Sequence, residues 1–209
     1  MPEIFHPAAS FGQQQKKPLR FEADIFECEV EGEIPASLQG AYFRAGPDRQ
    51  YPSLEGDIVL NGDGQVSAFW FEDGHVRFRS RYVMTERLKR EREAKRRLFG
   101  QYRNRYTDDP AVDNLPNRDN TGNTYAFAHH GSLYALREDS RPYRLDPATL
   151  ETLPVDEFGR LQSTALTGHP KLDPVTGGWW SYGVFARRAP TTDASLHVFF
   201  AAVAFWGWF

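Results

Sequence analysis

Hydrophobic and polar positions alternate in short runs along most of the chain, and Gly, Asp and Pro separate the runs. β-Branched and aromatic residues fill the runs at 41–44, 66–71, 75–82, 124–128 and 132–136. Runs bounded in this way are typical of antiparallel strands. Glu72-Asp73-Gly74 separates two of them, and Asp-Gly readily adopts the positive φ angles that a tight hairpin turn requires. The pattern therefore predicts an all-β fold in which residues 66–71 pair with residues 75–82.

One segment, residues 85–99, departs from the β pattern because it is rich in good helix formers. A narrow apolar stripe runs along it, formed by Met84, Leu88, Ala94 and Leu98. We therefore predict a short surface helix near 85–99. Its many Arg and Lys side chains are interleaved with glutamates and have no aromatic stacking platform beside them, so we interpret them as a solvated face rather than as a nucleic-acid surface.

Two short-range repeats favour a β-meander. Tyr143-Arg144-Leu145-Asp146-Pro147 and Leu172-Asp173-Pro174 both end a short run in Asp-Pro, as repeated meander units of a β-propeller do. His129-His130-Gly131 lies between the runs at 124–128 and 132–136. Because neighbouring side chains of a strand point to opposite faces, the two histidines are better explained as turn residues than as ligands of one metal ion.

Composition narrows the classes of function. The chain has 209 residues, 40% of them hydrophobic and 14% aromatic, which is enough to build a core. A formal net charge of -3 gives no field for nucleic acid or an anionic membrane, so a small molecule is the expected partner. Cys28 is the single cysteine and the N-terminus lacks a signal pattern, which indicates a reducing cytoplasm. Residues 1–20 have little apolar periodicity and are expected to form a flexible arm.

Several blocks share the order and spacing of one known family. They include Gly40-Ala41-Tyr42-Phe43-Arg44-Ala45-Gly46-Pro47, Asn61-Gly62-Asp63-Gly64, Phe99-Gly100-Gln101-Tyr102-Arg103-Asn104, Ala135-Leu136-Arg137-Glu138-Asp139-Ser140 and Thr167-Gly168-His169-Pro170. On these blocks the chain resembles the carotenoid cleavage oxygenases, and in particular their lignostilbene dioxygenase branch. The resemblance runs from about residue 21 to residue 193. It implies that this region is the N-terminal part of a seven-bladed β-propeller.

The same resemblance implies an enzyme. Members of the family hold one non-haem Fe(II) ion on the propeller axis with four histidines, and His169 matches the first of them. A neutral imidazole suits Fe(II), although a histidine beside a turn is also a common loop residue. The implied reaction is the cleavage of a carbon–carbon double bond of a lignostilbene- or carotenoid-type alkene by O₂ into two carbonyl products.

Two further positions concern the substrate. Family members of the lignostilbene branch use a Tyr and a Lys to polarise or deprotonate a phenolic hydroxyl. Tyr102 matches the tyrosine, but Arg137 stands at the lysine position. Arginine keeps the positive charge and can pair with a phenolate, but its pKa lies too far above neutrality for it to accept the proton. Arg137 is therefore either an electrostatic anchor or a sign that stilbene specificity is lost.

Other family positions also differ here, at Ala45, Leu60 and Gln65. They leave open whether the substrate is a stilbene, a carotenoid or another alkene. Residues 62–64, Gly-Asp-Gly, predict a further hairpin turn rather than a ligand site.

The resemblance fades before the end of the chain. Residues 194–209 form an apolar tail that matches no family block, and a frameshift or premature stop accounts for it better than a membrane anchor does, because a span needs about 20 apolar residues. The family's other three iron ligands do not occur in recognisable blocks, so we expect this chain to be inactive alone. Two alternatives remain: a non-enzymatic β module that binds an aromatic small molecule, and a partner that pairs with a full-length homologue.

Overall fold

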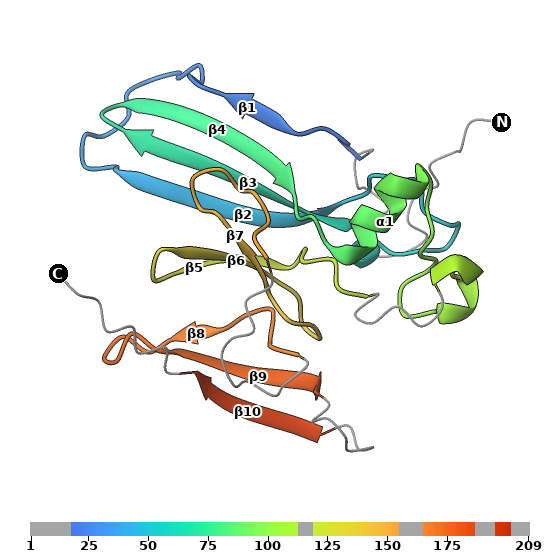
Figure 1. Ribbon diagram of the computed structural model, residues 1–209. Helices are drawn as coiled ribbons and strands as arrows, with labels where there is room; N and C mark the ends of the chain where they lie inside the picture. Colours follow the sequence, from blue (N-terminus) through green and yellow to red (C-terminus); the bar gives the residue numbers. More distant parts are fainter. Residues whose placement is uncertain (1–17, 113–118, 155–164, 187–194, 202–209) are drawn as a thin grey trace.

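Three antiparallel sheets form the framework of the described chain. The computed structural model describes residues 18–112, 119–154, 165–186 and 195–201, with only the backbone described for 183–186 and 195–201. The first sheet has the order β1-β4-β3-β2, the second β5-β6-β7 and the third β10-β9-β8. In Figure 1 they follow one another from top to bottom. The all-β prediction is confirmed in this sense, while the count of seven blades stays a prediction.

The strands of the first sheet are β1 (Ala23–Ile25), β2 (Gly40–Asp48), β3 (Asp63–Glu72) and β4 (His75–Tyr82). Those of the second are β5 (Tyr125–His129), β6 (Ser132–Leu136) and β7 (Tyr143–Leu145). Those of the third are β8 (Lys171–Leu172), β9 (Trp179–Ala186) and β10 (Ser195–Ala201). β10 pairs with β9 and lies inside the tail predicted over 194–209. Most of the predicted N-terminal arm, residues 1–17, lies outside the described residues.

The predicted hairpin between β3 and β4 is confirmed. Glu72 pairs with His75, and the two residues between them have positive φ angles, 50° at Asp73 and 84° at Gly74. These are the angles of a two-residue turn whose twist matches that of the strands. The β5–β6 hairpin has the same form, since His129 pairs with Ser132 across His130 and Gly131, whose φ angles are 44° and 72°.

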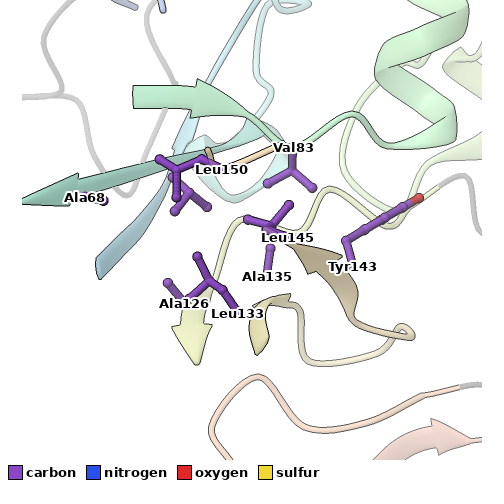
Figure 2. Packing of buried hydrophobic residues seen from close by; sticks show 9 residues of the cluster. Ala68, Val83, Ala126, Leu133, Ala135, Tyr143, Leu145 and Leu150 are labelled. Atoms are coloured by element: carbon purple, nitrogen blue, oxygen red, sulfur yellow. The ribbon is translucent and has the colours of Figure 1, made fainter. Parts of the chain in front are cut away.

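Apolar side chains join the sheets. Figure 2 shows the largest buried cluster, in which Ala68 of β3 and Val83 lie over side chains of the second sheet. Its members from the second sheet and the turn after it are Ala126, Leu133, Ala135, Tyr143, Leu145 and Leu150. A second cluster, built from Phe127, Tyr134, Leu136, Leu166 and Trp179, connects the second sheet to the third. Removal of the apolar surface of these two clusters from water is the main driving force that packs the sheets together.

Helix α1 (Glu86–Ala94) is shorter than the predicted 85–99. Thr85 caps its N-terminus by accepting a hydrogen bond from the Leu88 N–H at 3.1 Å. Lys95 takes a left-handed conformation, with φ 53°, and ends the helix. The N–H groups of Leu98 and Phe99 then bind the Glu91 carboxylate, at 2.9 and 3.0 Å, instead of continuing the helix.

The interpretation of the charged helix positions as a solvated face is wrong for two residues. Arg87 is 3% exposed and Glu91 is 2% exposed, so one face of α1 directs charged side chains into the protein interior. Burial raises the pKa of the Glu91 carboxyl, against the opposing effect of the Arg87 charge. Sequence periodicity did not reveal this face because it assumes that buried helix positions are apolar.

The Asp-Pro repeat is a structural repeat. Asp146 accepts hydrogen bonds from the N–H groups of Ala148 and Thr149, and Asp173 accepts them from Val175 and Thr176. Each aspartate thereby closes a turn between paired residues, Leu145 with Thr152 and Leu172 with Trp179. Backbone donors hold the pKa of both carboxyls below the ordinary value. The prediction of repeated meander units is confirmed at these turns.

The prediction of a hairpin turn at residues 62–64 is wrong. Asp63 is the first residue of β3 and pairs with Asp48. Gly64 donates from its N–H to the Thr121 carbonyl at 2.9 Å and accepts from the Val83 N–H at 2.8 Å. A side chain at Gly64 would overlap the carbonyl oxygens of Thr121 and Gly122. Glycine is present here because the first sheet and the chain before β5 approach each other closely.

We expect Gly64→Ala to lower the free energy of unfolding by about 1–3 kcal/mol, because backbone atoms cannot move away from an added methyl group cheaply. Gly46→Ala is the matched control, since the nearest atoms to its added methyl are side-chain nitrogens of Arg44 at 3.9 Å. It should change the stability by less than about 0.5 kcal/mol. Urea denaturation of the two variants checks the difference, and equal stabilities would contradict the close approach.

Candidate substrate and metal site

Tyr102 lies in the loop that follows α1, and contacts on both sides fix this loop. The Tyr102 N–H donates to Asp57 Oδ1 at 2.9 Å. Gly100 packs against Thr107 so closely that a side chain there would overlap the Thr107 backbone. Arg103 is held at φ 55°, a left-handed conformation that costs a non-glycine residue energy. The tyrosine is therefore presented by a loop with little freedom to move.

A buried polar network lies behind the loop. Asp57, which holds the Tyr102 N–H, also accepts from Asn61 Nδ2 at 2.9 Å and pairs with Arg49. Asn61 donates to the Gly100 carbonyl at 2.8 Å and accepts from Arg87 Nη1 at 2.6 Å. Since Arg87 belongs to α1, the network connects the helix, the segment that precedes β3 and the tyrosine loop. Buried charges persist when they are paired in this way.

Arg137 follows β6 and is 4% exposed. Its Nε donates to Asp139 Oδ1 at 3.0 Å and its Nη1 donates to Thr121 Oγ1 at 2.6 Å. The centre of its guanidinium lies 5.3 Å from the centroid of the Tyr102 ring, within the range of a cation–π contact. The structure thus brings together Tyr102 and Arg137, which the sequence predicts to share a substrate site.

Asp139 connects a second guanidinium to the same ring. Its Oδ2 accepts from Arg103 Nη2 at 2.6 Å, and the Arg103 guanidinium lies 5.2 Å from the Tyr102 ring centroid. Burial alone raises the pKa of the Asp139 carboxyl, but the Arg137 charge and the hydrogen bond from Arg103 outweigh it, so this pKa lies below its ordinary value. The same hydrogen bond raises the pKa of Arg103.

His169 lies apart from these contacts. The backbone N–H of His169 donates to Thr167 Oγ1 at 3.1 Å, and the His169 side chain is 58% exposed. Its Nε2 lies 3.2 Å from Glu138 Oε1, and the Tyr125 ring lies 5.8 Å from its ring. Gly168 allows this approach, because a side chain at that position would come within 2.8 Å of Glu138. Among the described residues, no hydrogen bond or ring contact joins His169 to Tyr102 or Arg137.

Thr121, Glu138 and Asp139 are among the site residues that sequence reasoning missed. Glu138 and Asp139 stand in the same block as Arg137, so the signal was present. The sequence does not show their partners, because Arg103 and His169 lie far from them along the chain. Thr121 had no signal of its own, since a buried threonine that accepts from an arginine looks like any polar loop residue.

His129 and His130 do not form a metal site with other described residues. His129 ends β5, where its ring stacks on Phe127 and Trp179 at 5.7 and 5.6 Å, and His130 lies in the turn. Burial and the neighbouring His130 lower the pKa of His129, which favours a neutral ring. The prediction of turn residues is correct for His130 and wrong for His129.

The donor set fits an iron site only in part. The half-exposed imidazole of His169 is a suitable ligand for Fe(II), but Glu138 lies against its Nε2 and would have to move away from that atom. Within the described ranges, however, no group of three or more His, Cys, Asp or Glu side chains is placed to hold a metal ion. His169 would therefore act with ligands from elsewhere.

The comparison with known families decides the identity of the chain. Residues 16–203 match the family described as retinal pigment epithelial membrane protein. The chain belongs to this family. Lignostilbene-alpha,beta-dioxygenase isozyme III of Sphingomonas paucimobilis is 47% identical over 181 residues, which cover 86% of this chain and 36% of the relative. Isoeugenol monooxygenase of Pseudomonas nitroreducens is 45% identical over 182 residues, with 87% and 38% covered. The resemblance to carotenoid cleavage oxygenases is confirmed.

Solved structures agree with this assignment to the retinal pigment epithelial membrane protein family. The crystal structure of Pseudomonas brassicacearum lignostilbene dioxygenase superimposes with a TM-score of 0.75 at 45% identity, over 80% of this chain and 35% of that chain. This family member therefore spans little more than a third of the length of these relatives. Among its described residues, no helix is both long and apolar enough to cross a membrane.

In this family member, Asp139→Asn should lower the free energy of unfolding at neutral pH by about 2 kcal/mol, because two guanidiniums lose a charged acceptor. The folded-state pKa of Asp139 is depressed, so its stabilising effect is complete above the ordinary carboxyl pKa and is lost as pH falls through the lower folded value. Urea denaturation should show the gap between wild type and variant narrowing below about pH 4.

Asp73→Asn is the control for this prediction, since Asp73 lies in the exposed turn between β3 and β4, where asparagine also tolerates a positive φ. This substitution should change the free energy of unfolding by less than about 0.5 kcal/mol at pH 7 and at pH 3. A gap for Asp139→Asn that is the same at pH 7 and pH 3 would mean that the carboxylate charge is not what holds the two arginines.

Proposed function

We propose that this chain is part of an Fe(II)-dependent dioxygenase that cleaves the carbon–carbon double bond of an aromatic alkene. One molecule of O₂ supplies one oxygen atom to each of the two carbonyl products, so the double bond is broken and no other redox cofactor takes part. The observation that carries the proposal is the packing of Arg137 on the Tyr102 ring. Its support is the family membership and the likeness to a lignostilbene dioxygenase and an isoeugenol monooxygenase.

Tyr102 and Arg137 would bind the polar end of the substrate. A tyrosine hydroxyl and a guanidinium both donate hydrogen bonds, so together they present donors to an oxygen on an aromatic ring. The Asp57 contact to the Tyr102 backbone and the Asp139 and Thr121 contacts to Arg137 hold both side chains in place before a substrate arrives. Such preorganisation lowers the entropic cost of orienting the alkene.

His169 would contribute one neutral imidazole to the iron site. The iron, when bound, supplies a place where O₂ and the alkene react. Glu138 lies against His169 Nε2 and would compete for this atom when iron is absent. In the loaded site we assign His169 the role of ligand, and the remaining ligands would come from outside the described residues.

The 209-residue chain on its own should neither retain iron nor form aldehydes. One imidazole binds Fe(II) weakly and without selectivity, because stable sites need several fixed ligands and supporting hydrogen bonds. After incubation with Fe(II) and dialysis, metal analysis should find well under one iron ion per chain. Incubation with a hydroxystilbene and O₂ should give no aldehyde by chromatography. Stoichiometric iron together with aldehyde products would show that the chain is an enzyme by itself.

A chimera tests the proposed function directly. Residues 21–186 of this chain would replace the matching part of Pseudomonas brassicacearum lignostilbene dioxygenase, to which the structure is similar at a TM-score of 0.75. With Fe(II) and O₂, the chimera should convert aromatic alkenes to two carbonyl products. His169→Ala should abolish this activity, and Tyr102→Phe should lower kcat/KM about tenfold or more, the effect of losing a hydrogen bond to a charged or polarised group.

Two matched substitutions serve as controls in the chimera. Tyr106 is fully exposed, and the His75 side chain is 73% exposed, so Tyr106→Phe and His75→Ala should leave the activity unchanged. A chimera that is folded by circular dichroism and loaded with iron, yet gives no carbonyl product from stilbene or carotenoid alkenes, would refute the proposal.

A further inference from the structure

The proposed function requires the tyrosine loop to keep a fixed position relative to His169. Tyr102 would bind one end of an aromatic alkene while His169 holds the metal beside the double bond, and a displacement of about 1 Å can cost a reaction about a hundredfold in rate. In the described part of the chain, no hydrogen bond or ring contact joins Tyr102 to His169. Their separation is therefore set by residues that lie between them.

Asn123 lies where these segments meet, and it is 6% exposed. Its Nδ2 donates to the Leu60 carbonyl at 3.0 Å and to the Gly62 carbonyl at 2.7 Å. Both protons of the amide are thereby used, and they hold the backbone on either side of Asn61. Two contacts fix this segment more firmly than one, because the segment cannot pivot about a single hydrogen bond.

Asn61 connects the held segment to the tyrosine. Its Nδ2 donates to the Gly100 carbonyl at 2.8 Å and to Asp57 Oδ2 at 2.9 Å. Asp57 Oδ1 in turn accepts from the Tyr102 N–H at 2.9 Å. Asn61 and Asp57 are each 2% exposed, so water does not replace these bonds if they are lost. The backbone of the tyrosine therefore depends on the position that Asn123 gives to Asn61.

On its other side, Asn123 is continuous with the chain that borders His169. Thr124 is the next residue, and its N–H donates to the Leu136 carbonyl at 2.9 Å. A methyl group at Gly168 would come within 2.8 Å of Thr124 Cγ2, so the Thr124 side chain packs against the residue that precedes His169. A displacement of Asn123 would thus reach His169 through one backbone step and one van der Waals contact.

We infer that Asn123 is a positioning residue, which fixes the distance between the tyrosine loop and His169. The inference rests on the proposed function in so far as this distance places the double bond of the substrate beside the metal. Asn123 acts through Asn61 and Thr124 rather than on the reacting atoms. An aspartate of the same shape would not serve, because a carboxylate has no proton to donate to the two carbonyls.

The first test is amide hydrogen exchange of the 209-residue chain, followed by mass spectrometry on peptides that contain Tyr102 or His169. Asn123→Ala removes both hydrogen bonds of the amide. It should speed exchange at the Tyr102 and His169 N–H groups about tenfold or more, the effect expected when one or two buried hydrogen bonds are lost.

Asn120→Ala is the matched control for this test. Asn120 belongs to the same segment, is 4% exposed and donates from its Nδ2 to the Arg141 carbonyl at 2.8 Å. Its replacement removes a buried amide without touching the contacts around Asn61, so it should leave exchange at both N–H groups unchanged. Equal acceleration in Asn120→Ala would mean that the chain has loosened generally, and it would overturn the inference.

The inference also fails if Asn123→Ala leaves exchange unchanged at either N–H group, or if the unsubstituted chain protects neither of them. Where Asn123→Ala does not fold by circular dichroism, Asn123→Ser takes its place. Serine keeps a single donor, so exchange at both groups should still be faster than in the unsubstituted chain.

The second test is a double-mutant cycle in the chimera, with rates expressed per iron-loaded molecule. Asn123→Ala should lower kcat/KM about tenfold. Addition of Tyr102→Phe should lower it little further, because a displaced tyrosine no longer binds the substrate in the transition state. In the Asn120→Ala background, Tyr102→Phe should keep its full effect of about tenfold. A purely structural asparagine would give multiplicative effects with Tyr102→Phe, and that result would contradict the positioning role.

The two tests separate this inference from the proposed function. A chimera that cleaves alkenes with multiplicative effects leaves the dioxygenase proposal intact and removes the role of Asn123. A chimera that cleaves no alkene removes the dioxygenase proposal, and hydrogen exchange in the 209-residue chain then decides whether Asn123 connects the two segments.

Discussion

The buried hydrogen bonds of Asp57 and Asn61 are the constraint on which the candidate site depends. Asn61 connects Arg87 of α1 to the Gly100 carbonyl, and Asp57 binds the Tyr102 N–H. A loop of this kind ordinarily lies on the surface and moves. Here the loop is tied at Gly100 and at Tyr102 to the buried side chains of Asn61 and Asp57, which hold the tyrosine backbone in place. The cost is a set of buried charges that only mutual pairing makes tolerable.

Arg137, like the tyrosine, is held in place by hydrogen bonds to neighbouring side chains. Asp139 and Thr121 hold its guanidinium against the Tyr102 ring, and Asp139 brings in Arg103 from the other side. A lysine could not make these contacts, because its ammonium has no planar fork and no Nε to pair separately. Arg137 therefore holds a fixed positive charge at this position, because a guanidinium does not release its proton near neutral pH.

Local patterns in the sequence predicted much of the fold. Asp73-Gly74 indicated the β3–β4 hairpin, and the two Asp-Pro sequences indicated equivalent turns, because turn geometry depends on a few adjacent residues. The errors concern contacts between distant segments. The turn prediction for Gly64 is wrong because nothing near it in the chain reveals the approach of Thr121. The solvent prediction for Arg87 and Glu91 is wrong because their partners lie outside the helix.

For the candidate site, Tyr102, Arg137 and His169 were identified from the family resemblance, and their pairing with Asp57, Asp139 and Glu138 needed the structure. The most direct test of the account is a crystal structure of the chimera with iron and 4-hydroxystilbene, recorded at the iron absorption edge. The account predicts an iron peak in contact with the His169 imidazole, and the ligand hydroxyl within hydrogen-bond distance of Tyr102 and Arg137. Iron bound away from His169, or a ligand that leaves Tyr102 and Arg137 untouched, would contradict it.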